Sequence, residues 1–183
     1  MFSMHVFSLD DHSQDGLPQL SDEMLGRAAP MFCREPVYCH ASGDEDHFYQ
    51  RALELVGPLL TLAFEFETTY RELQTVELTD VIYIEESDQV VGCCLIVGCK
   101  MINMVQGMAV HPAFRGKGLG SALVGCLPLL LSKQKVGLCV DRDTDATERL
   151  VQFYERFEFE VTPDEEDAYS EADTEIFMRK RFE

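Results

Sequence analysis

The chain turns from a predicted strand into a predicted helix at Arg115-Gly116-Lys117-Gly118-Leu119-Gly120-Ser121. Glycines at three alternate positions keep this turn free of Cβ atoms and permit the positive φ angles that a tight turn needs. The first N–H groups of the following helix have no intrahelical partner, and together with the helix dipole they form an anion site. Arg115 and Lys117 add positive charge. The turn therefore predicts a phosphate or diphosphate ligand, and the alternative is a turn that binds nothing.

Two well-known phosphate-binding turns do not fit this spacing. A P-loop needs Gly-x-x-x-x-Gly-Lys-Ser/Thr, and Lys117 stands in the wrong place for it. A dinucleotide-binding turn needs Gly-x-Gly-x-x-Gly, but counting from Gly116 ends on Ser121, and counting from Gly118 ends on Leu123. The strand before the turn is also the third of a meander rather than the first of a parallel unit. The sequence therefore argues against both of these nucleotide-binding folds.

Apolar and β-branched residues before the turn predict an antiparallel meander. Its strands cover residues 81–85, 89–97 and 101–111, with Glu86-Ser87-Asp88 as the first turn. After the turn come a helix at 119–133 that contains Pro128, a strand at 136–141, a helix at 146–157 and strands at 159–162 and 174–180. An acidic loop, residues 164–173, separates the last two strands. This order predicts an α/β fold of the α+β type with a mixed sheet, not a doubly wound parallel sheet.

The residues before the meander read mainly as helices. A short strand at 3–9 comes first, and Ser21 can cap a helix that Pro30 limits. A loop follows around Glu35-Pro36-Val37. Residues 48–66 then repeat apolar side chains at helical spacing behind a capping box of Ser42 and Glu45. Gly57-Pro58 interrupts this pattern, so we expect either two abutting helices or one kinked helix.

Length, composition and charge limit the class of protein. The 183 residues correspond to a single domain, 1–183, and 46% hydrophobic with 26% charged residues is a globular composition. Acidic residues outnumber basic ones by 33 to 15, which gives a formal charge of −18. A nucleic-acid-binding protein must neutralise phosphates with Lys and Arg, so we expect no nucleic-acid partner. A cationic partner is compatible with this charge.

The cysteines and the N-terminus indicate a cytoplasmic protein. Seven cysteines, an odd number, lie mostly in apolar runs without a CxxC pair, so we expect reduced thiols, no disulfide framework and no metal site. Cys39, His40 and His47 come nearest to metal-ligand spacing. The sequence shows neither a signal peptide nor a run of about 18 apolar residues, so we expect no membrane partner.

Three blocks resemble one family. Met108–Gly120 is similar to the acetyl-CoA motif of the GNAT superfamily of N-acyltransferases, with Arg115, Gly118 and Gly120 at its three signature positions. Phe153–Phe159 resembles the family's L-Y-E-K-x-G-F segment, and Ile176–Lys180 its last strand. The resemblance covers about residues 80–181, and the preceding helices are loosely similar to those of the subset around puromycin N-acetyltransferase.

The resemblance implies that acetyl-CoA binds where the motif strand separates from the next parallel strand. Backbone groups near Met108, Ala109 and Val110 would pair with the pantetheine arm and polarise the thioester carbonyl. The diphosphate would lie on Arg115 and on backbone N–H groups of the turn, which are those of Gly116, Lys117, Gly118, Leu119, Gly120 and Ser121. An acceptor amine would attack the thioester directly, without a metal.

Tyr154 matches the family's tyrosine beside the sulfur of CoA and would protonate the leaving thiolate as general acid. The alternative is that it only packs between Phe153 and Phe157. Many relatives have a glutamate on the motif strand as base, whereas residues 101–108 contain no carboxylate. Other candidate bases are Glu65, Glu67, Glu85 and His111; the alternative for His111 is a simple turn residue.

Two positions depart from the family pattern. Thr147 stands where relatives have an asparagine near the start of the last helix. Glu158 replaces a glycine that suits a left-handed position at the helix end, where any other residue is strained. Both departures leave the affinity for the coenzyme in question.

The acceptor implied is a primary amine on a small molecule or a peptide. Carboxylates in the hairpin turn and in the loop 164–173 favour a cationic acceptor such as a polyamine, a basic peptide or an aminoglycoside-like amine. A phosphorylated amino sugar is the alternative acceptor, although the chain offers few basic residues for it. Two other functions stay open: a non-catalytic acyl-CoA-binding or interaction module, and a structural domain that binds no CoA. A second copy of the chain, in a homodimer, is a further partner that the sequence allows.

Overall fold

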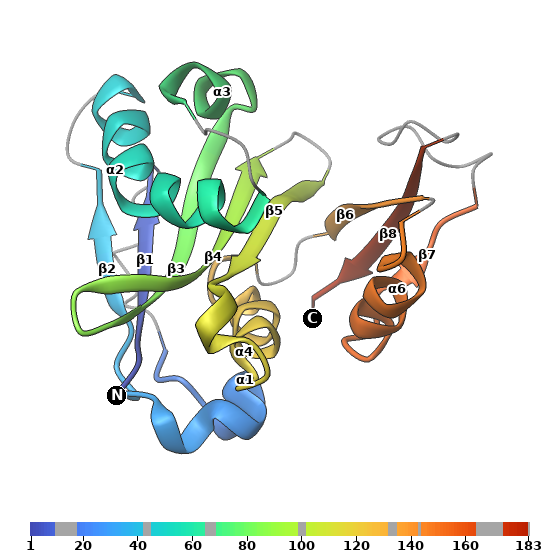
Figure 1. Ribbon diagram of the computed structural model, residues 1–183, viewed down its shortest axis with the longest axis horizontal. Helices are drawn as coiled ribbons and strands as arrows, with labels where there is room; N and C mark the ends of the chain where they lie inside the picture. The colour runs from blue at the N-terminus through green and yellow to red at the C-terminus, as the bar shows by residue number, and fades with distance from the viewer. Residues whose placement is uncertain are drawn as a thin grey trace.

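The computed structural model describes residues 1–9, 18–41, 45–64, 69–98, 102–131, 135–142, 144–163 and 174–182. Within these ranges the strands form a mixed sheet in the order β2-β1-β3-β4-β5-β6-β8-β7 (Figure 1). The strands are β1 (Ser3–Ser8), β2 (Val37–His40), β3 (Leu78–Glu86), β4 (Gln89–Gly98), β5 (Asn103–Val110), β6 (Lys135–Asp141), β7 (Glu160–Val161) and β8 (Glu175–Arg181). β5 runs parallel to β6, and β1 parallel to β2, while the other neighbours are antiparallel. The predicted fold class is therefore confirmed.

Helices cover both faces of the sheet (Figure 1). One face packs against α1 (Asp22–Leu25), the 3-10 helix η1 (Gly26–Met31), α4 (Leu119–Cys126), α5 (Pro128–Leu131) and α6 (Thr147–Glu155). The other face packs against α2 (Glu45–Phe64) and α3 (Tyr70–Thr75). Side chains alternate between the two cores, so Cys94 joins the first and Cys93 the second. Burial on both faces explains the continuous apolar sequence of β4.

The predicted meander is confirmed as β3, β4 and β5. Ser87 and Asp88 connect β3 to β4 with positive φ angles of 51° and 61°, which match the twist of a tight hairpin. The helix predicted at 119–133 is divided just before Pro128 into α4 and α5, because a proline inside a helix removes a backbone hydrogen bond. No helix in the part of the chain that the structure describes is long and apolar enough to span a bilayer.

The N-terminal part differs from the sequence prediction in two places. Val37 begins β2, where the sequence predicted a loop around Glu35-Pro36-Val37. β2 is a short edge strand whose side chains are mostly exposed, so it lacks the apolar alternation that would reveal it. Residues 45–64 form a single helix with Pro58 inside it. Buried residues on both sides of the proline, Val56 and Leu59, hold this helix on the second core. Ser42, Glu65 and Phe66 lie outside the described residues.

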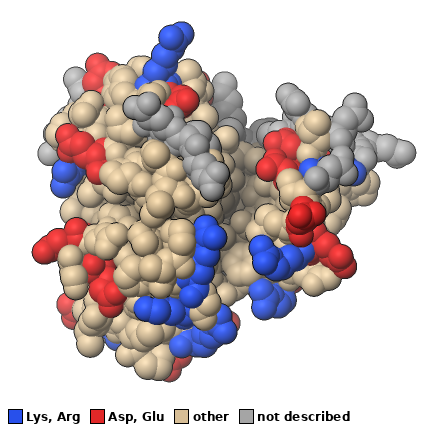
Figure 2. All heavy atoms as spheres, viewed as in Figure 1, with Lys and Arg blue, Asp and Glu red and all other residues tan. Residues whose placement is uncertain are grey.

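β5 and β6 pair over a short distance and then separate. Their parallel register covers Asn103↔Val136, Met104↔Gly137 and Val105↔Leu138. On the other side of β5, the register to β4 moves from Val105 to Gly107, which leaves Gln106 as a bulge. Beyond this bulge, residues 106–110 have no partner on β6. Figure 2 shows a hollow between the part that contains β1–β5 and the part formed by β6–β8 and α6.

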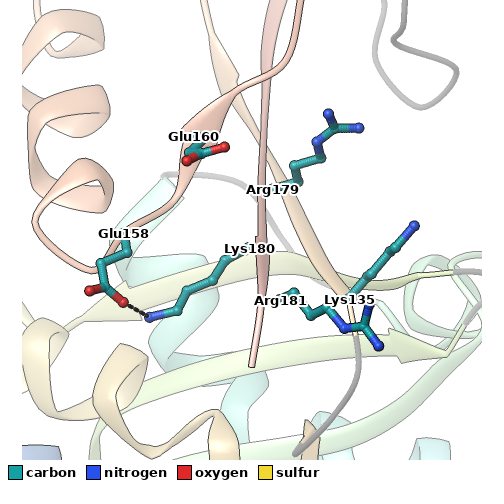
Figure 3. A pocket seen from close by; sticks show the side chains of 6 residues that line it. All are labelled: Lys135, Glu158, Glu160, Arg179, Lys180 and Arg181. Atoms are coloured by element: carbon teal, nitrogen blue, oxygen red, sulfur yellow. Dashed lines mark hydrogen bonds and ion pairs between the residues drawn. The ribbon is translucent and has the colours of Figure 1, made fainter. Parts of the chain in front are cut away.

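The end of α6 confirms the strained position predicted for Glu158. Glu158 has φ +63°, its N–H donates to the carbonyl of Glu155, and the N–H of Phe159 donates to that of Tyr154. This is the Schellman arrangement, in which glycine is the usual residue. The amino group of Lys180 donates to the Glu158 carboxylate at 2.9 Å (Figure 3). It also donates to the Phe157 carbonyl at 2.8 Å. The hydrogen bond from Lys180 lowers the pKa of Glu158.

We predict that Glu158→Gly stabilises the protein. Glycine removes the strain of a positive φ, and the exposed ion pair that is lost contributes little, so the Tm should rise by about 2–4 °C in thermal unfolding. Because Lys180 lowers the pKa of Glu158, the ion pair stabilises the wild type at neutral pH and is lost as the pH falls through that pKa. The advantage of the variant should therefore grow on acidification. Glu155→Gly, inside the helix, is the control and should lower the Tm. A lower Tm for Glu158→Gly would contradict the prediction.

Candidate functional site

The glycine-rich turn joins β5 to α4 through the short 3-10 helix η2 (Pro112–Phe114). Gly116 and Gly118 have φ angles of +78° and +90°, which side-chain-bearing residues rarely adopt. Gly118 is the N-cap of α4 and offers no side chain to its first N–H groups, while its carbonyl accepts from Ala122 at 3.0 Å. The N-terminal amides of α4 therefore stay available to a ligand, as the sequence predicts.

A cleft of about 530 Å³ opens at this turn. One wall consists of the turn itself, with Val110 and residues 114–116 and 118–121. The opposite wall comes from Phe153, Arg156 and Phe157 on and after α6. A third side, from residues 23–27, belongs to α1 and η1. Figure 2 shows Lys and Arg side chains on both sides of the lower part of the hollow.

The edge of β5 that faces β6 leads from the turn toward the bulge. The N–H of His111 donates to Val91 on β4, whereas the carbonyl of Val110 accepts from Nε of Arg115 at 3.2 Å. Main-chain groups of successive residues alternate between the two edges of a strand. Met108 and Val110 therefore turn their main-chain groups toward the gap, and Ala109 pairs with Cys93 on β4.

Comparison with known proteins agrees with this geometry. Residues 78–161 match the family model described as an acetyltransferase (GNAT) domain. Residues 78–161 therefore carry the sequence pattern of a GNAT acetyltransferase domain. Among curated protein sequences, none matches the chain.

Solved structures share the fold of this GNAT domain at low sequence identity. The ribosomal-protein-S18-alanine N-acetyltransferase from Escherichia coli is 16% identical with a TM-score of 0.56, over 72% of this chain and 88% of that one. Naa50 from Arabidopsis thaliana, in complex with the bisubstrate analogue CoA-Ac-MVNAL, is 22% identical with a TM-score of 0.54, over 72% and 93%. Ard1 from Thermoplasma volcanium is 19% identical with a TM-score of 0.51, over 73% and 93%.

The cleft of the GNAT domain collects most of the residues expected to bind the coenzyme. Val110, Arg115, Gly116, Gly118, Leu119, Gly120 and Ser121 all line it. Lys117 belongs to the turn, but its amino group lies over the ring of Phe114, 4.6 Å from the centroid. Met108 lies on the gap edge of β5, and Ala109 is buried against the α2 side.

Tyr154 lies beneath the cleft rather than in its wall. It is buried in the first core, with its ring 5.0 Å from that of Phe153 and 5.9 Å from that of Phe159. Burial, with a smaller contribution from the nearby Cys94 thiol, raises the pKa of Tyr154 well above its ordinary value. The phenol therefore keeps its proton at neutral pH.

Thr147 connects α6 to the end of β6. Its hydroxyl donates to the carbonyl of Asp141 at 2.7 Å and accepts from the N–H of Thr144 at 3.1 Å. α6 begins at Thr147, and its N-cap, Ala146, makes no side-chain cap. This hydroxyl ties the start of α6 to the last residue of β6, beyond the point where β6 separates from β5.

The candidate bases do not meet in the cleft. The Nδ1 atom of His111 accepts from the N–H of Ala113 at 3.2 Å, which fits a turn residue. Glu85 and His111 line a second cavity of about 620 Å³ under α2, together with Glu54 and Asp88. Glu65 and Glu67 lie outside the described residues. No three His, Cys, Asp or Glu side chains among the described residues are grouped to hold a metal ion.

Two basic residues of the cleft, Arg27 and Arg156, were not predicted from the sequence. Arg156 lies inside the block that resembles the family, and its guanidinium carbon is 5.4 Å from the centroid of the Phe153 ring. The positive charge of Arg156 beside Phe153 and Phe157 was the sequence signal that could have identified it. Arg27 comes from a segment far from the turn in sequence, so no local pattern indicates that it reaches the cleft.

We predict that Gly118→Ala destabilises the fold by about 1–2 kcal/mol, because an L-residue is strained at φ +90°. An added Cβ would also meet Cγ of Arg27 at 2.8 Å. Urea unfolding measures this loss. The double variant Gly118→Ala with Arg27→Ala should regain only the stability that is lost through the contact with Arg27, and not the stability lost through backbone strain. Gly107→Ala is the control, since its Cβ would find ordinary contact at 3.8 Å. Equal stabilities for the Gly118 and Gly107 variants would contradict the prediction.

Proposed function

We propose that the chain is an N-acetyltransferase that transfers the acetyl group of acetyl-CoA to a primary amine. The observation that carries this proposal is the gap between β5 and β6, which runs from the bulge at Gln106 to the glycine turn. A thioester carried on a long arm with a diphosphate at its other end fits such a gap. GNAT acetyltransferases use acetyl-CoA, and the bisubstrate analogue of the similar Naa50 joins CoA to a peptide.

The coenzyme would bind through main-chain groups. Its diphosphate would accept hydrogen bonds from the N–H groups of residues 116–121, with Arg115 beside them. Its pantetheine arm would pair with the β6-facing edge of β5 at the main-chain groups of Met108 and at the N–H of Val110, since the Val110 carbonyl already accepts from Arg115. Glycines at 116 and 118 support this fit, because each holds a positive φ that shapes the turn.

The chemistry would be a direct attack of the amine on the thioester carbonyl. An N–H group near the bulge, directed at the developing oxyanion, contributes about 3 kcal/mol to such a step. Holding the amine against the thioester lowers the entropic part of the barrier. The amine loses a proton to water or to a base, and the C–S bond of the tetrahedral intermediate then breaks. Tyr154 gives its proton to the leaving thiolate and is protonated again from solvent.

Burial raises the pKa of Tyr154, which makes the free phenol a weaker acid. The role as general acid therefore requires the bound coenzyme to place negative charge next to the phenol as the C–S bond breaks. The acceptor would enter from the α2 side, where Glu54, Glu85 and Asp88 line the second cavity. These carboxylates favour an amine that bears further positive charge.

A non-catalytic module that binds acyl-CoA is the second candidate. The observation that favours it is the burial of Tyr154 together with the absence of a carboxylate on β5 in the described chain. The same cleft would then bind the coenzyme without turnover.

We predict that Tyr154→Phe lowers kcat by about 10²–10⁴-fold and leaves the Kd for CoA unchanged, because only proton transfer to the thiolate is lost. Thiol release from acetyl-CoA measures this, with spermidine, a lysine-rich peptide and glucosamine 6-phosphate as acceptors. Tyr70→Phe, which removes the hydroxyl that donates to Asp46 on the α3 side, is the matched control. Coenzyme binding without thiol release for any amine would favour the module.

A further inference from the structure

A segment outside the matched family region packs closely against α4. Residues 18–34 precede the matched residues 78–161, and α1 within this segment lies on α4. A Cβ at Gly125 of α4 would lie 2.1 Å from the carbonyl oxygen of Met24, so only glycine permits this approach. Leu25 and Ala28 are fully buried in the first core. The segment is therefore held in a defined place beside the cleft.

This segment places Arg27 across the glycine turn. Nη2 of Arg27 donates to the carbonyl of Gly116 at 2.8 Å. The side chain passes directly over Gly118, where an added Cβ would lie 2.8 Å from Cγ and 3.1 Å from Nε of Arg27. Because Gly118 has no side chain, the backbone can adopt the positive φ of the turn, and the side chain of Arg27 has space to cross it.

The basic side chains that line the cleft are not simply those that the sequence of the turn suggests. Lys117 places its amino group over Phe114 and does not line the cleft. Arg27, Arg115 and Arg156 do line it, together with one carboxylate, Glu23, so the cleft keeps an excess of positive charge in a chain of formal charge −18. A guanidinium carries five N–H donors, and the bond to Gly116 uses one of those of Arg27. Among the described residues the other donors meet no acceptor, so they can bind an anion beside the N-terminal amides of α4.

We propose that Arg27 binds the diphosphate of the coenzyme, so that the third side of the cleft, which α1 and η1 form, is part of the coenzyme site. This inference rests on the proposed function, because it assumes that acetyl-CoA occupies the cleft. Arg27 would act in two ways. Its bond to the Gly116 carbonyl keeps that oxygen away from the anion, and its remaining donors add charge-assisted hydrogen bonds to the phosphates.

Isothermal titration calorimetry on the full chain tests this proposal with the variants Arg27→Met and Arg27→Lys. The titrants are acetyl-CoA, its 3′-dephospho form and S-acetylpantetheine, which has no diphosphate. We expect Arg27→Met to weaken acetyl-CoA and the 3′-dephospho form alike, by about 10- to 100-fold, because charge-assisted hydrogen bonds are lost. Arg27→Lys should show a smaller loss, since a lysine keeps the charge without the fork. S-acetylpantetheine should bind the wild type and both variants equally.

Arg71→Met, on α3 and away from the cleft, is the matched control for the loss of one exposed arginine. Binding of acetyl-CoA to Arg27→Met with the affinity of this control would overturn the proposal. A loss that S-acetylpantetheine shares would also overturn it, because Arg27 would then only hold the fold. A loss confined to acetyl-CoA and absent with the 3′-dephospho form would overturn the assignment to the diphosphate. Failure of the wild type to bind acetyl-CoA would instead remove the proposed function.

Discussion

The parallel pairing of β5 and β6 ends at Val105 and Leu138, and the rest of the site depends on that short ladder. A longer ladder would close the gap with backbone hydrogen bonds, while the first core already joins the two parts of the sheet through buried side chains. The bulge at Gln106 bends β5 at this point, and Thr147 fixes the far end of β6 through the Asp141 carbonyl. On this edge of β5 the Val110 carbonyl accepts from Arg115, and water or a ligand can satisfy the other main-chain groups beyond the ladder.

The two ends of the gap have different chemistry. At the glycine turn, amides and arginines gather in a chain that is otherwise strongly acidic. Under α2, the cavity is lined by Glu54, Glu85 and Asp88 around an ion pair of Arg51 with Glu54. An anionic coenzyme and a cationic acceptor would therefore approach the thioester from opposite sides. Because the two ends are separate, the strongly negative net charge would favour the cationic acceptor, and basic residues are needed only at the glycine turn.

Local sequence signals predicted the elements that carry strong local patterns. The meander, its turn at Ser87 and Asp88, the glycine turn and the strained Glu158 were each visible in a few neighbouring residues. Features formed by segments far apart in the sequence were not visible in this way. β2 has no apolar alternation, and Arg27 reaches Gly116 across 89 positions of sequence. Lys117 seemed an anion ligand from its place in the turn, but the rings of Phe114 and Phe2 offered its ammonium another neighbour.

The central claim is that coenzyme binding is centred on the glycine turn and the free edge of β5. Backbone amide NMR during a titration with acetyl-CoA tests it most directly, since each amide reports its own surroundings. The account predicts that the largest shifts fall on residues 116–121 and 106–110, with smaller ones near Arg27 and none in α3. Shifts concentrated under α2 with an unchanged turn, or no shifts at saturating coenzyme, would contradict it.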